Sequence, residues 1–83
     1  MRIVIVRWWD AVGTAEWTVK EEAKDTGLSE ALTIGHLLYE DTERIVICHS
    51  LTEDLVNGVF AIPMGCVFEI ERVSDFTSTK EGR

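Results

Sequence analysis

The stretch VFAIPMGCVFEIERV, residues 59–73, decides the fold of this chain. Two short runs of β-branched and aromatic residues flank Pro63, the only proline in the sequence. Because proline has no backbone N–H to donate to a sheet ladder, the first run should end as a strand at this residue. Residues 64–66 leave room for a single 3₁₀ turn, after which residues 67–73 resume as a strand. A strand, a one-turn helix and a strand are typical of the closing part of a small five-stranded barrel of the Src-homology-3 or Sm-like type.

The first strand is predicted at residues 2–11, RIVIVRWWDA. Its β-branched residues occupy both faces, so both faces should be covered by other parts of the protein. After a loop, Thr18 and Glu21 have the spacing of a capping box. We therefore expect a short helix near residues 18–26, ended by Gly27, whose thin apolar stripe rests on one end of the barrel.

A hairpin is predicted at residues 31–51, where two strand-like runs flank the turn sequence EDTE. With a tight turn there, Gly35 faces Cys48 across the ladder. His36 then shares the opposite face with Ile45. Both faces are apolar, whereas a solvent-facing hairpin would have one polar face. One face should line the core and the other should meet the helix or another subunit, which predicts a homo-oligomer.

Three tryptophans, Trp8, Trp9 and Trp17, are many for so short a chain. Successive side chains of a strand point to opposite faces, so Trp8 and Trp9 cannot both face the core. One of them should lie under the helix or at a subunit contact. Packing in a core or an interface and stacking against a base both remain open for these side chains.

The chain has 83 residues, which is the size of one domain. We place this domain, a mainly β small barrel, at residues 1–73 and a polar tail at residues 74–83. At this size only about 60–65% of the unfolded surface can be buried, so stability is marginal without partners.

The apolar runs near the start are too short for a membrane span or a secretory signal, which predicts a cytoplasmic protein without a membrane partner. Cys48 and Cys66 are then expected to be reduced.

The net charge of −7, from 15 acidic and 8 basic residues, restricts the possible partners. Binding to long nucleic acid depends on Lys and Arg side chains that neutralise phosphates, so this composition argues against it. A small phosphorylated ligand needs only two or three local cations and stays open.

Four motifs occur in order between Trp8 and Val73: W-x-D-A…W…E-A, T-I-G-H-L-L-x-E-D, R-I-V-I-x-H and I-P-x-x-x-V. Their succession resembles a family of short proteins encoded by tailed bacteriophages and prophages, many without an assigned activity. The resemblance implies an Sm-like barrel, often in a homo-oligomer, in the cytoplasm of a bacterial host. Some small phage barrel proteins act in anti-defense by sequestering the cyclic-nucleotide signals of bacterial immunity.

Candidate ligand-binding residues are Trp17 with Lys20 near the predicted helix start, and His36 with Arg44 and His49 on the hairpin. An indole ring can stack on a base, and a nearby cation can hold a phosphate. The two histidines alternatively belong to the core or to an interface. No third ligand joins them, so we expect no metal. No nucleophile, base and orienting group come together either, so we expect no catalytic residues, no cofactor and no enzymatic activity.

Three functions therefore remain from the sequence. The first is a non-enzymatic, oligomeric phage-type binding module, a sponge that holds a nucleotide immune signal at its subunit junctions. The second is a structural or assembly scaffold for another protein, which the acidic charge fits equally well. The third, Sm-like RNA binding, suits the fold but not the charge.

Overall fold

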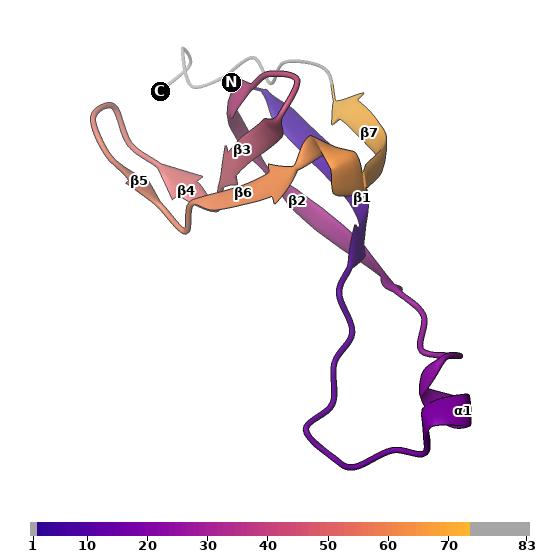
Figure 1. The fold of residues 1–83 in the computed structure, drawn as a ribbon. Helices are drawn as coiled ribbons and strands as arrows, with labels where there is room; N and C mark the ends of the chain where they lie inside the picture. Colours follow the sequence, from indigo (N-terminus) through magenta and orange to yellow (C-terminus); the bar gives the residue numbers. More distant parts are fainter. Residues whose placement is uncertain (1, 74–83) are drawn as a thin grey trace.

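The computed structural model describes residues 2–73, which are mainly β-structure (Figure 1). The strands are β1 (Ile3–Asp10), β2 (Ser29–Glu40), β3 (Arg44–Cys48), β4 (Ser50–Leu51), β5 (Val56–Asn57), β6 (Phe60–Pro63) and β7 (Val67–Val73). They are joined by a short helix, α1 (Lys20–Ala23), and a 3₁₀ turn, η1 (Met64–Cys66). The predicted polar tail, residues 74–83, lies outside the described residues.

Five strands form one antiparallel sheet in the order β6-β3-β2-β1-β7, and these are the strands expected from the sequence. The last two residues of the predicted hairpin, Ser50–Leu51, instead form β4, which pairs with β5 in a separate two-stranded sheet. In the described part of the chain no ladder joins the two edge strands, β6 and β7, so the hydrogen-bonded sheet is not closed. η1 carries the chain from one edge to the other and lies against β1 and β3.

The segment around Pro63 folds as predicted. Pro63 ends β6, the next three residues form η1, and β7 begins immediately afterwards. The N–H of Met64 donates a hydrogen bond of 2.8 Å to the carbonyl oxygen of Glu43. The 3₁₀ turn is therefore attached to the turn between β2 and β3.

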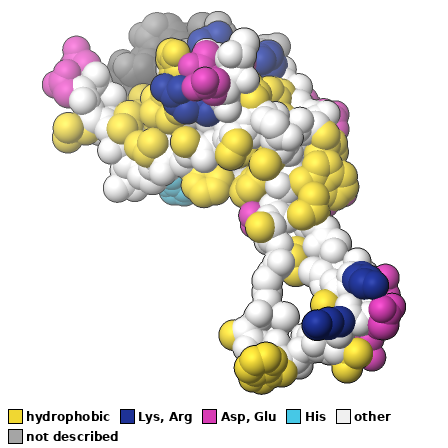
Figure 2. All heavy atoms as spheres, in the orientation of Figure 1, with side chains coloured by type: hydrophobic (Ala, Val, Ile, Leu, Met, Phe, Trp, Pro, Cys, Tyr) yellow, Lys and Arg dark blue, Asp and Glu magenta, His cyan; other side chains and the backbone are white. Residues whose placement is uncertain are grey.

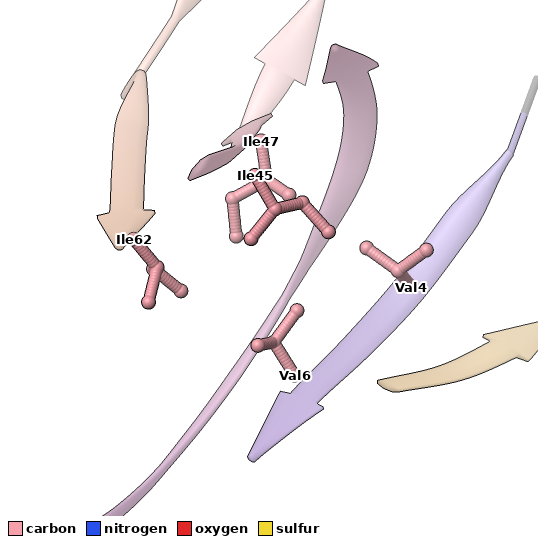
Figure 3. Close-up of a cluster of buried hydrophobic side chains, with 5 residues drawn as sticks. All are labelled: Val4, Val6, Ile45, Ile47 and Ile62. Atoms are coloured by element: carbon pink, nitrogen blue, oxygen red, sulfur yellow. The ribbon is translucent and has the colours of Figure 1, made fainter. Parts of the chain in front are cut away.

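The core lies on the inner side of the sheet, where side chains of three strands point toward one another (Figure 3). Its fully buried members are Val4 and Val6 of β1, Ile45 and Ile47 of β3, and Ile62 of β6. Each buried side chain of this kind contributes about 1.5–3 kcal/mol to folding. So small a core leaves little reserve of stability.

The register of the β2–β3 hairpin differs from the prediction. His36, rather than Gly35, pairs with Cys48. Leu38 has no ladder partner, because the register shifts between its two neighbours, as at a β-bulge. Ile45 therefore faces the core while His36 lies on the outer side, and the predicted common face of these two residues is wrong.

The helix also differs from the prediction, because α1 is shorter than residues 18–26 and ends before Gly27. Its N-cap residue, Val19, makes no side-chain cap hydrogen bond, and the hydroxyl of Thr18 instead donates to the carbonyl oxygen of Glu16 at 3.4 Å. α1 buries none of its residues. The predicted apolar stripe against the end of the barrel is therefore wrong.

Gly35 occupies a point of close approach between β2 and β3. A Cβ added at this position would lie 2.8 Å from the carbonyl oxygen of Cys48 and 3.2 Å from the side chain of Ile47. Because a backbone oxygen in a ladder cannot move aside, only glycine fits here without displacing a strand.

We expect Gly35→Ala to lower the free energy of unfolding by about 1–3 kcal/mol, because the added methyl group overpacks this contact. Urea denaturation followed by circular dichroism measures the change. Gly13→Ala is the control, since nothing lies within 4 Å of a Cβ built at residue 13. Equal losses of stability in the two variants would contradict the steric role of Gly35.

An ion pair connects the two strands that flank β1. Arg72 of β7 donates two hydrogen bonds to the carboxylate of Glu40 on β2, with N–O distances of 2.7 and 2.9 Å. These hydrogen bonds hold the pKa of the Glu40 carboxyl below its usual value.

Because the pKa of Glu40 is lowered in the folded state, its contribution to stability is present above the unfolded pKa of about 4.3 and is lost as the pH falls through the folded pKa. We therefore expect Glu40→Gln to be less stable than the wild type at neutral pH and the difference to shrink as the medium becomes acidic. Thermal unfolding at a series of pH values measures it. Glu53→Gln, at an exposed position, is the control. A difference that does not change with pH would contradict this role of Glu40.

Candidate functional site

The five residues predicted from the sequence as a ligand site lie in separate regions. Trp17 and Lys20 belong to the segment that joins β1 to β2, His36 lies within β2, Arg44 begins β3, and His49 lies between β3 and β4. Trp17 and Lys20 share a region and are already close in the sequence, and His49 directly follows Cys48, the ladder partner of His36. Within one chain the predicted site is therefore not assembled.

Arg44 is engaged in the turn between β2 and β3. Its Nη1 lies 3.2 Å from Oδ2 of Asp41, and its Cζ lies 5.1 Å from the ring centre of Tyr39. Asp41 also accepts hydrogen bonds from the backbone N–H groups of Glu43 and Arg44, at 2.8 and 2.9 Å, and from the Tyr39 hydroxyl at 2.9 Å. These hydrogen bonds, that of Glu43 first, hold the pKa of the Asp41 carboxyl below its usual value. Arg44 could bind a phosphate only by leaving this network.

The two histidines, His36 and His49, also contact neighbouring residues of their own chain. The Nδ1 atom of His36 is buried without a hydrogen-bond partner, and His36 faces Cys48 across the ladder. Nδ1 of His49 lies 3.0 Å from the hydroxyl of Ser50. The chain passes close to His49 at Gly58, whose φ of +70° favours glycine. Among the described residues, no three His, Cys, Asp or Glu side chains cluster as a metal ion would require.

Trp8 and Trp9 separate as the sequence predicted. Trp8 turns inward, packs against the core and donates a hydrogen bond of 2.9 Å to the hydroxyl of Thr33. Trp9 turns outward and is 41% exposed, with its ring centre 4.8 Å from that of Phe68. The outward tryptophan is thus part of a second apolar surface.

This second surface, which we call the outer face, lies on the side of the sheet away from the core. It consists of Ile5 and Trp9 of β1, Leu32 and Ile34 of β2, and Phe68 of β7. Ile5 and Ile34 are direct partners in the ladder, and Ile34 is 58% exposed. No element in residues 2–73 forms a layer over these side chains. The two-sided apolarity of the sequence predicted such a face, but not which residues compose it.

Charged groups accompany the apolar side chains of the outer face. Nε of Arg7 lies 3.2 Å from Oε1 of Glu69, its ladder partner on β7. Glu71, the ladder partner of Ile5, is exposed and forms no ion pair with any described residue. Glu30, the ladder partner of Trp9, is also exposed and forms no ion pair with any described residue, so the apolar side chains of the outer face are accompanied by one ion pair and by the carboxylates of Glu30 and Glu71.

A second uncovered feature is the arm, which we define as residues 11–28. Every residue of the arm is exposed, and Trp17 is 103% exposed, more than in a reference peptide. Val12, Val19 and Leu28 are also exposed. The arm projects from the sheet, and hydrophobic side chains lie at its outer end (Figure 2). The radius of gyration of 17.3 Å exceeds the value of about 11–12 Å for a compact chain of this length.

The β4–β5 hairpin contains a shallow cavity of about 260 Å³. Its lining consists of Ser50, Leu51, Thr52, Leu55, Val56 and Asn57. The cavity is smaller than the usual ligand pocket of about 300–1,000 Å³ and has no cation for a phosphate. It is a weaker candidate than the outer face and the arm.

Comparisons of the chain with protein-family models, with curated proteins and with solved structures found no match. The described residues include no helix that is long and apolar enough to cross a membrane. The exposed apolar side chains thus define the candidate site, which consists of two surfaces, the outer face of the sheet and the arm between β1 and β2.

Proposed function

We propose that the protein is a non-enzymatic interaction module that assembles with protein partners through the outer face of its sheet. The observation that supports this function is a contiguous apolar surface, with Ile34 at 58% exposure, that no described element covers. Soluble monomers rarely expose large contiguous apolar patches, and such patches mark interaction sites. Assembly would also supply the burial that the small core lacks.

We also propose that the sheet belongs to the small-barrel class with Sm-like or Src-homology-3-type topology. Three features support this assignment: the order of the five strands, η1 between the two edge strands, and a core shared by β1, β3 and β6. In such barrels side chains fill the inside, and partners bind outside. Membership of the phage family stays a prediction, since no comparison tests it.

A protein partner agrees with the electrostatics of the chain. At a net charge of −7 a long nucleic acid would be repelled, and three of the four arginines in residues 2–73, Arg7, Arg44 and Arg72, already form ion pairs with carboxylates. The outer face offers its partner apolar side chains instead of cations. The scaffold function is therefore favoured over RNA binding.

We expect the wild-type protein at micromolar concentrations to sediment above the 9.4 kDa mass of one chain. Ile34→Glu should shift it toward the monomer, because a carboxylate at the outer face would have to be desolvated in the contact. Sedimentation equilibrium measures the mass. Thr42→Glu adds the same charge at the exposed turn between β2 and β3 and should leave assembly unchanged. A wild-type protein that remains monomeric would contradict the proposal.

A nucleotide-like ligand is a second candidate, favoured by the exposure of Trp17. Lys20, three residues later in the arm, forms no ion pair with any described residue. Together they offer a stacking surface and a cation for a phosphate. In this function the module would sequester a nucleotide immune signal at a junction between subunits.

Calorimetric titration of cyclic di- and trinucleotides and of ADP-ribose derivatives tests this second candidate. We expect Trp17→Ala to weaken binding about 5- to 150-fold, since base stacking contributes about 1–3 kcal/mol. Arg44→Ala should leave the affinity unchanged, because Arg44 is engaged with Asp41. The absence of heat with every compound on the wild type would reject the ligand function and leave the interaction module.

A further inference from the structure

We propose that the arm of one chain docks on the outer face of a second copy, so that two chains exchange arms in a closed two-fold dimer. This inference rests on the proposed interaction function and names its partner. Each chain has one arm with exposed apolar side chains and one uncovered outer face. In an isologous dimer each arm meets one face and each face meets one arm, so the assembly closes at two copies.

The sheet directs the arm away from its own outer face. β1 and β2 remain paired as far as Asp10 and Ser29, whereas the pairing of β1 with β7 ends at Trp8. The arm therefore begins beyond the end of the sheet, at the tip of an extended two-stranded ladder (Figure 1). To cover its own face, the chain would have to reverse direction at this tip. The face of a second copy requires no such reversal.

One cation of the arm and one carboxylate of the outer side are available to pair in this contact. Lys20 on the arm and Glu71 on the outer face form no ion pair with any described residue. They are of opposite sign, and each lies beside an apolar side chain, the exposed Val19 and the half-buried Ile5 respectively. Because two chains of charge −7 repel each other, their contact needs such pairing together with apolar burial.

The surfaces are large enough for a specific contact. The arm and the outer face together comprise 23 residues of each chain. A standard protein–protein interface uses about 20–30 residues a side. Trp17, fully exposed in the single chain, has the size and residue type of the anchors that dominate such interfaces.

The first experiment mixes an arm variant with a face variant of the full chain. Trp17→Ser and Ile34→Glu alone should each dimerise about 30-fold or more weakly than the wild type in sedimentation velocity. An equimolar mixture should associate more tightly than either variant alone, because the intact arm of one variant meets the intact face of the other. A mixture no tighter than the variants would contradict arm exchange.

The second experiment reverses charges. Lys20→Glu should weaken the dimer several-fold, and addition of Glu71→Lys should restore the dissociation constant to within about twofold of wild type. Lys24→Glu is the matched control, because it changes the net charge equally but Lys24 already pairs with Glu21 of its own chain at 3.0 Å. No rescue by the double reversal would contradict this pairing.

The outcomes separate the two proposals. If Ile34→Glu dissociates the protein and Trp17→Ser does not, the outer face is an interaction surface but the arm is not its occupant. A wild-type monomer overturns both proposals. Weaker dimerisation of Trp17→Ser cannot be attributed to unfolding, because Trp17 makes no buried contact in its own chain. The circular dichroism spectrum of this variant should therefore equal that of the wild type.

Discussion

The sheet has apolar residues on both faces, but its core covers only one of them, and the rest of this structure depends on this constraint. The buried side chains come from β1, β3 and β6 and lie on the inner side, while the outer side carries apolar residues such as Ile34. In many folds a helix supplies the second layer. Here the described helix has four residues and buries none of them. The described residues thus leave the outer side of the sheet uncovered, and on the proposed function another molecule covers it.

Local covalent chemistry explains what the sequence predicted well. Pro63 lacks an N–H in any tertiary context, so β6 had to end near it, and three residues suffice for the turn that follows. The split between Trp8 and Trp9 follows from the pleat of a strand, in which successive side chains point to opposite faces. The five main strands were recognisable for the same reason, because their β-branched residues favour extended backbone.

Features that depend on distant parts of the chain were not predictable in this way. Thr18 and Glu21 have capping-box spacing, but an isolated helix this short is marginal, and α1 has no partner to lengthen it. The bulge at Leu38 shifts the register between β2 and β3, and it moved His36 to the opposite face from the one expected. The sequence placed Asp41 in the turn but did not show that its carboxylate pairs with Arg44, so Arg44 was predicted to be free to bind a ligand. The candidate site needed contacts across strands, which residue spacing does not contain.

The pairing of β1 on both edges has a consequence for how the protein is made. Ile3 of β1 pairs with Val73 of β7, which lies 70 positions later in the chain. One edge of β1 therefore stays open until β7 has left the ribosome. Sheets with such long-range pairing fold slowly, and an open edge can pair with other chains in the meantime. The nascent chain therefore cannot complete its fold progressively from the amino-terminal side. Its first strand must await release of the last.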